Sequence, residues 1–100
     1  MLKNYNHSTL TNTPATLVTV ATGHEVVVFG LRIVGAATAS TLTLTINDGT
    51  SDVCSWTKAL DAFDMLSDDG RIALPAGYLL KAEANADGIK IMVSADDSEV

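Results

Sequence analysis

The sequence predicts an all-β fold: a small antiparallel β-sandwich, or a jelly-roll-like domain, of about seven or eight strands with an extended N-terminal arm. Two observations predict this class. From Ala15 nearly to the end of the 100 residues, apolar and polar side chains alternate with the period of two that half-buried strands show. Turn residues interrupt the alternation about every 8–12 residues, and no stretch has a clear helical period.

Composition and pattern divide the chain into three expected parts: an N-terminal arm over residues 1–14, the β-sandwich over residues 15–95, and an acidic C-terminal tail over residues 96–100. The arm is rich in Asn, Thr and Ser and has no steady period. Segments of that kind stay apart from a domain unless other residues hold them down. We therefore expect the sandwich to fold without residues 1–13.

The first two expected strands cover residues 16–21 and 26–34, joined by a turn in which Gly23 supplies permissive dihedral angles. Both faces of the second strand are largely apolar: Val27, Phe29, Leu31 and Ile33 on one side, and Val26, Val28, Gly30, Arg32 and Val34 on the other. A strand that is apolar on both faces is central in its sheet, or one face meets another subunit.

The clearest alternation is in residues 41–47, where leucine and isoleucine alternate with threonine. This pattern predicts a half-buried strand. Asp48-Gly49 then favours a hairpin into a strand over residues 51–57, in which Cys54 and Trp56 share one side. Residues 59–66 fit either a short helix or an irregular strand, and we interpret them as a loop that ends in a short strand. Three further strands are expected over residues 71–74, 78–84 and 89–94, the last two joined by a turn at residues 85–88.

Charge and hydropathy exclude two classes of partner. The net charge is −6, from 12 acids and 6 bases, and the bases are scattered singly, so the chain lacks the basic face that nucleic acid requires. The longest apolar stretch, residues 26–31, ends at Arg32 and is far shorter than a membrane span. The polar N-terminus lacks the apolar centre of a signal peptide, so we expect synthesis in a cytoplasm.

No pattern predicts an enzyme, a cofactor or a metal site. Cys54 is the one cysteine, which excludes a disulfide framework, and we expect it to be a buried or half-buried thiol. His7 lies in the arm, and His24 lies in a turn beside Glu25, where we expect a solvated side chain. The carboxylates of residues 61, 64, 68 and 69 match neither a glycosidase pair nor a calcium loop, and we interpret them as a solvated loop.

The strand order resembles that of a known group of proteins. The segments that carry the resemblance are residues 19–28, 31–34, 41–46, 72–82 and 89–94. Their order and turns are similar to small β-sandwich virion structural proteins of tailed bacteriophages, of the capsid decoration or cement type. The turn at Gly23 departs from the Pro-Ala-Gly form often met there, whereas residues 75–77 keep it. The resemblance implies no catalytic residues, and it implies homotrimers on the capsid lattice with arms that reach over neighbouring subunits.

The leading hypothesis from the sequence is therefore a capsid decoration protein on the outer surface of the virion that binds the major capsid protein. The alternatives are a neck, tail or fibre component, and a carbohydrate- or cell-surface-binding module that uses Trp56 and Tyr78. The apolar content of 47% exceeds what a thin sandwich needs and points to contact with other chains. The residues expected at interfaces are Leu2, Tyr5, Leu10, Val26, Val28 and Trp56.

Overall fold

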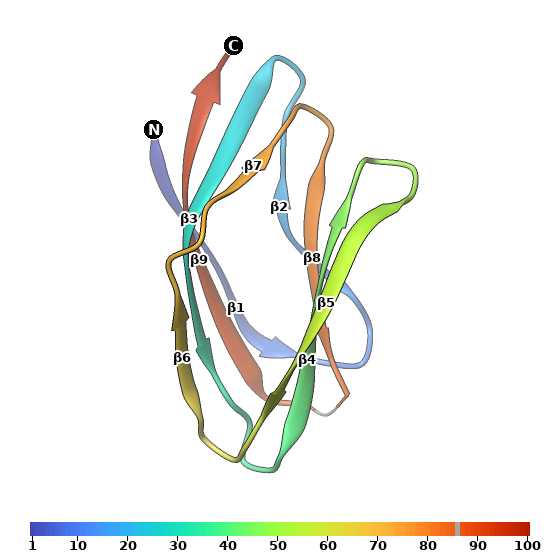
Figure 1. Cartoon of the computed structure of the whole chain (residues 1–100), viewed down its shortest axis with the longest axis vertical. Helices are drawn as coiled ribbons and strands as arrows, with labels where there is room; N and C mark the ends of the chain where they lie inside the picture. The colour runs from blue at the N-terminus through green and yellow to red at the C-terminus, as the bar shows by residue number, and fades with distance from the viewer. Residues whose placement is uncertain (86) are drawn as a thin grey trace.

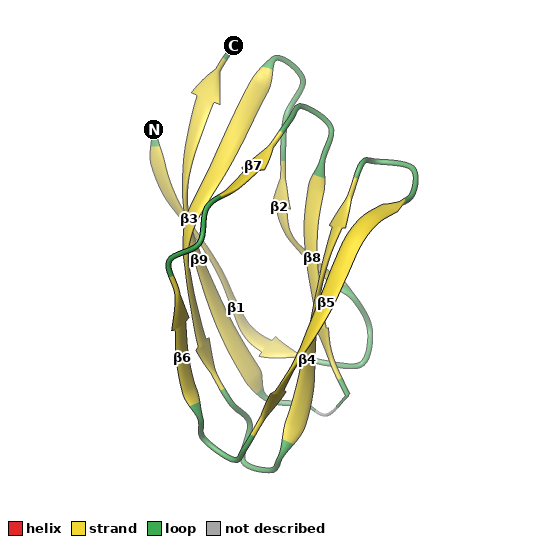
Figure 2. Cartoon of the chain, in the orientation of Figure 1, coloured by secondary structure: helices red, strands yellow, loops and turns green. Residues whose placement is uncertain are grey.

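The computed structural model describes residues 1–85 and 87–100, and it is an all-β sandwich of two antiparallel sheets (Figure 1). Within those residues there are nine strands and no helix (Figure 2). The strands are β1 (Leu2–Leu10), β2 (Ala15–Thr19), β3 (His24–Val34), β4 (Ser40–Asn47), β5 (Asp52–Leu60), β6 (Met65–Asp68), β7 (Ile72–Leu74), β8 (Leu79–Ala84) and β9 (Ile89–Glu99). The predicted fold class is confirmed.

The two sheets differ in size and in how their edges end. The five-stranded sheet has the order β1-β9-β3-β6, and β7 pairs with another part of β3. β6 and β7 therefore share one edge, β6 beside residues 31–34 and β7 beside residues 26–28. The four-stranded sheet has the order β2-β8-β4-β5, so β5 is an edge strand.

The core between the sheets is almost entirely aliphatic. Its largest fully buried side chains are Leu10, Leu42, Leu74, Leu80, Ile89, Val18, Val26, Val28 and Val93. Burying each such side chain contributes about 1.5–3 kcal/mol. Every aromatic residue lies outside this fully buried set, because Tyr5 and Tyr78 are only partly buried and the other three rings are exposed. The aromatic side chains are thus mostly left for the surface.

β3 is central in its sheet, between β9 and the β6–β7 edge, which was one of the two expected alternatives. It has one core-facing side, which corrects the assignment of residues to its two faces. Its register with β9 shifts between Val28 and Gly30, so a β-bulge lies at Phe29. The extra residue reverses the alternation, because a bulge adds one residue to one strand only. Val28 before the bulge and Leu31 after it both face the core, whereas Phe29 is exposed. The apolar surplus of this strand is therefore used largely inside the chain.

The N-terminal segment is extended, as expected, but it lies in the sheet and not apart from it. β1 pairs antiparallel with β9, and Leu10 at its end is 0% exposed. The backbone continues this attachment, because the Gly88 amide donates to the Leu10 carbonyl at 3.2 Å. The acidic C-terminal residues continue β9 beside β3, where Asp97 is opposite Val26 and Glu99 is opposite His24. Both terminal segments thus belong to the five-stranded sheet.

Residues 59–66 form the end of β5, a tight turn and the start of β6. The short strand expected at the end of this segment is present as β6. In the turn Phe63 has a φ of 57°, and its amide donates to the Ala36 carbonyl at 2.9 Å. Of the turn expected at residues 85–88, Ala86 lies outside the described residues.

Candidate functional site

The carboxylates of the loops bond to their own backbone. Asp64 Oδ2 accepts a hydrogen bond from the Asp61 amide at 2.8 Å. Asp48 accepts bonds from the amides of Thr50 and Ser51, both at 2.9 Å, and the bond from Ser51 is the main cause that lowers the pKa of Asp48. Among the described side chains, which do not include that of His7, no three His, Cys, Asp or Glu gather in a way that could hold a metal ion. These acids have a local structural use.

His24 is paired with a carboxylate, which corrects the expectation of a solvated turn histidine. Its Nδ1 lies 2.8 Å from Asp97 Oδ1, and Lys3 Nζ donates to Asp97 Oδ2 at 3.0 Å. The hydrogen bonds from His24 and then Lys3 lower the pKa of Asp97. The hydrogen bond to Asp97 and the charge of that carboxylate raise the pKa of Lys3. This cluster joins β1, β3 and β9. The side chain of His7 lies outside the described part of the structure.

β5 is an exposed edge strand. Its first eight residues are all exposed, and only Leu60 at its end is buried. Proteins protect edge strands with prolines, bulges or charges, because unpaired backbone groups can pair with another chain. β5 has no proline, and Lys58 is its one basic residue; its pairing with β4 is irregular only near its start, between Asp52 and Cys54. Cys54 is also exposed, so the prediction of a buried or half-buried thiol was wrong.

Trp56 lies where the sandwich is open between β5 and the β6–β7 edge. Its partner across β4 is Leu44, so the ring is on the core side of the sheet, yet it is 37% exposed. Two hollows of about 130 and 460 Å³ adjoin the ring. We call their apolar lining the seam: Leu31, Ile33, Leu42, Leu44, Ile46, Trp56, Leu66 and Ile72. Here the core meets solvent.

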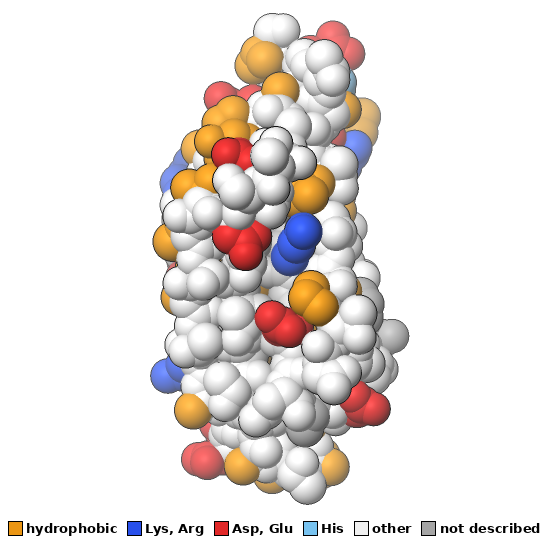
Figure 3. Space-filling model, turned by 90° about the vertical axis from the view of Figure 1, so that its right-hand side faces the viewer, with side chains coloured by type: hydrophobic (Ala, Val, Ile, Leu, Met, Phe, Trp, Pro, Cys, Tyr) orange, Lys and Arg blue, Asp and Glu red, His pale blue; other side chains and the backbone are white. Residues whose placement is uncertain are grey.

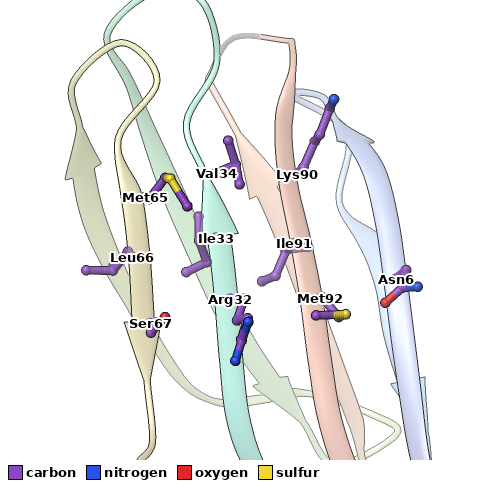
Figure 4. A pocket seen from close by; sticks show the side chains of 10 residues that line it. All are labelled: Asn6, Arg32, Ile33, Val34, Met65, Leu66, Ser67, Lys90, Ile91 and Met92. Atoms are coloured by element: carbon purple, nitrogen blue, oxygen red, sulfur yellow. The ribbon is translucent and has the colours of Figure 1, made fainter.

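A further hollow of about 400 Å³ lies on the outer face of the five-stranded sheet (Figure 4). Side chains from β1, β9, β3 and β6 line it. Strand pairing aligns them, with Arg32 opposite both Met92 and Ser67, and Val34 opposite both Lys90 and Met65. We call it the groove: Asn6, Arg32, Val34, Met65, Ser67, Lys90 and Met92, with Ile33, Leu66 and Ile91 beneath. It combines apolar side chains with two cations.

The outer face of the four-stranded sheet is different in chemistry. The threonines at positions 41, 43 and 45 alternate with buried or half-buried aliphatic residues and are half-buried themselves. Figure 3 views the molecule from this side, where white surface, which is backbone and uncharged polar side chains, dominates and a few charged side chains lie within it. This face lacks both the apolar lining of the seam and the two neighbouring basic side chains of the groove.

The residues expected at interfaces fall into two groups. Leu10, Val26 and Val28 are 0% exposed inside one chain, so they cannot contact a partner, and these assignments are corrected. Leu2 and Trp56 are exposed and Tyr5 is half-buried, so their interface role stays a prediction. Sequence reasoning missed the groove, because the alignment of residues from four strands depends on sheet order, which no local pattern encodes.

Trp56 and Tyr78, the two aromatic residues of the carbohydrate-binding alternative, lie in different surroundings. Trp56 lines the two hollows of the seam, and Tyr78 lines neither. Tyr78 instead packs against the core, and its carbonyl accepts from the Val20 amide at 3.0 Å. The hollows beside Trp56 therefore do not include Tyr78 in their lining.

Comparison with known proteins gives a limited result. No protein-family model matches the chain, and no curated protein matches it. Two solved structures are similar over 92% of the chain at 20% identity and a TM-score of 0.48. Both are described as a pentameric capsid protein isolated from metagenomic phage sequences, and the alignments span 59% and 60% of those longer chains. Similarity at this level assigns neither a function nor a partner. In the described residues, the structure has no helix capable of crossing a bilayer.

Proposed function

We propose that the chain is a bacteriophage virion structural protein of the decoration, or cement, type. In this role it binds the assembled shell of major capsid protein from outside and stabilises it. The observation that carries the proposal is that an exposed edge strand, β5, lies directly beside the open apolar seam. The order of strands and turns, which resembles virion proteins of tailed phages, supports the class.

The proposed contact has two components. The unpaired backbone of β5 can add to a strand of a capsid subunit, a mode in which main-chain hydrogen bonds supply affinity. Trp56, half-exposed at the seam, then serves as the anchor, because buried tryptophans dominate binding energy at many interfaces. Both components use surface that the chain leaves uncovered by itself.

The charge favours the outer surface of the shell. A net charge of −6 disfavours contact with packaged DNA, because like charges repel and phosphate binding requires cations. We therefore propose no nucleic-acid partner. The proposed role also includes no membrane or cofactor partner and no enzymatic activity. For the assembled state we propose a homo-oligomer, with a trimer as the expected form.

The test of location is the copy number on purified virions of the phage that encodes the chain. Quantitative mass spectrometry against the major capsid protein, with cryo-electron microscopy for position, should find hundreds of copies on the outer head. A few to dozens of copies at the neck or tail would replace the decoration role by the alternative structural role. Complete absence from virions would overturn both.

The test of mechanism compares two exposed residues of the same strand. Trp56 is on the core side of β5, opposite Leu44, whereas Val53 is 56% exposed and lies at the irregularity where the register of β5 with β4 shifts. Trp56→Ala should weaken attachment to shells stripped of the protein by about tenfold or more, whereas Val53→Ala should change it by less than about twofold. Equal effects of the two variants would exclude the seam as the contact.

A further inference from the structure

The turn that contains Phe63 presents an aromatic side chain to solvent in an unfavourable backbone conformation. Phe63 has a φ of 57°, a left-handed region that glycine and asparagine adopt far more readily than a bulky residue. Its side chain is 69% exposed, so burial in the chain does not offset this strain. Backbone strain of this kind persists where the surrounding structure enforces it, and it clusters at functional sites such as ligand clamps.

Hydrogen bonds hold this turn in one conformation. The Gly35 amide donates to the Asp64 carbonyl at 2.7 Å, and the Asp61 amide donates to Asp64 Oδ2 at 2.8 Å. Together with the bond from Phe63 to Ala36, they fix the turn against the end of β3. The ring is therefore presented by a preorganised turn, which lowers the entropy lost on binding.

The groove is lined by apolar and positively charged side chains, whereas the Phe63 turn carries an aromatic ring and two carboxylates. Met65, 82% exposed, and Val34, 38% exposed, supply apolar lining beside Met92. Arg32 and Lys90 supply two positive charges, and neither takes part in the ion pairs found among the described residues. The groove holds about 400 Å³. A cavity of about 150 Å³ already accepts benzene, so an aromatic ring fits.

We propose that the Phe63 turn of one copy docks into the groove of a second copy of this chain. The ring of Phe63 enters between the methionines, since thioethers make favourable contacts with aromatic rings. Asp61 and Asp64, both exposed, flank the ring and match the charges of Arg32 and Lys90. This local match matters because two copies of charge −6 otherwise repel each other.

This contact differs from the proposed contact with the shell. It uses the Phe63 turn and the outward side chains of the groove, whereas the shell contact uses β5 and Trp56 of the other sheet. Ile33 and Leu66 line both the groove and the seam, so the variants are placed at residues that belong to one contact only. The inference concerns purified protein without capsids, so it can fail while the proposed function stands, and the reverse also holds.

The experiment measures self-association of the full chain by sedimentation equilibrium and light scattering. Phe63→Gly removes the ring and relieves the backbone strain, so the variant should remain folded. The double variant Arg32→Glu/Lys90→Glu reverses the charge of the groove on an exposed face. Each variant should weaken self-association by about tenfold or more, and Val53→Ala, on the other sheet, should leave it unchanged.

Mixing the two variants gives the decisive result. Phe63→Gly keeps an intact groove, and Arg32→Glu/Lys90→Glu keeps an intact turn, so one productive contact can form between them. The mixture should give a 1:1 complex that neither variant gives alone. A wild-type chain that stays monomeric at millimolar concentration would overturn the proposal. Variants that associate as tightly as the wild type would do the same.

Discussion

Asp97 accepts a hydrogen bond from Lys3 Nζ at 3.0 Å, which ties the first strand of the chain to the last. The same carboxylate lies 2.8 Å from His24 Nδ1, so one side chain of β9 bonds to both of its neighbouring strands. The Asp97 side chain is only 13% exposed, and it therefore needs these partners. The position of β1 on the sheet depends in part on this charge.

Asp97 should make the stability of the domain depend on acid pH. Its hydrogen bonds with His24 and Lys3 lower its pKa in the folded state, so the stabilisation is present above the unfolded pKa of about 3.9. It is lost as the pH falls through the lower folded pKa. Asp97→Asn should therefore be less stable than wild type at pH 6, with a difference that shrinks below about pH 4. Urea unfolding from pH 2 to 7 measures this. A variant with the same pH slope as wild type would contradict the assignment.

Leu10 should matter to stability far more than Leu2 of the same strand. Leu10 is 0% exposed and Leu2 is 72% exposed. Leu10→Ala should cost about 2–5 kcal/mol, because it leaves a cavity in the core. Leu2→Ala should stay within about 0.5 kcal/mol of wild type. Chemical denaturation compares the two variants. Equal effects would show that β1 is not packed on the core, and that residues 1–14 are an arm apart from the domain.

The alternation of residues predicted the sandwich and most of its strands, but not what covers each strand. Trp56 and Cys54 do lie opposite the inward residues Leu44 and Ile46. They are nevertheless exposed, because the edge facing β5 has only β6, four residues long, and the short β7. Burial is decided by the opposite sheet, and sheet order is a long-range property that local patterns do not contain.

Two features of β1 and β3 were hidden for a more local reason. A bulge breaks the period of two, and each of these strands has a register irregularity, at residues 7–10 in β1 and at Phe29 in β3. In β1 the residues before this irregularity pair regularly with β9 but include few apolar side chains, so they show no readable alternation. In β3 the residues after the bulge were assigned to the wrong face relative to those before it. The bulge at Phe29 also explains the groove. Without it, the alternation would place Arg32 and Val34 on the core side with Val26 and Val28; with it, they face outward and line the groove.

Gly35 should not tolerate a side chain, because the Phe63 turn packs directly on it. A Cβ at this position would lie 2.9 Å from the Asp61 carbonyl oxygen and 3.1 Å from the Asp64 amide nitrogen. These are backbone atoms, so the turn must move, and Gly35→Ala should cost about 1–3 kcal/mol. Gly30→Ala is the matched control, since its Cβ would meet Ser94 Cβ at 3.7 Å. Thermal and urea unfolding should rank the two, and a neutral Gly35→Ala would show that the turn is not packed in this way.

Ser40 should be replaceable by alanine without loss. It is 5% exposed, and its Oγ has no hydrogen-bond partner among the described residues. An unpaired buried hydroxyl costs about 1–3 kcal/mol, so Ser40→Ala should be neutral or raise the free energy of unfolding. In contrast, the Ser94 hydroxyl donates to Asn4 Oδ1 at 3.0 Å, and Ser94→Ala should lose up to about 1.5 kcal/mol. If Ser40→Ala were the more destabilising of the two, its hydroxyl must have a partner.

Cys54 should react rapidly with thiol reagents in the native protein. It is exposed on β5, so labelling does not require unfolding, and its rate should lie within about tenfold of that in the denatured chain. Ellman's reagent measures both rates, and a native rate slower by orders of magnitude would mean that the thiol is covered.

The same measurement also reports on β5 in an assembly. Because Cys54 is the one cysteine of the chain, attachment to a shell through β5 should protect it. Labelling that is equally fast on the shell would place the contact elsewhere.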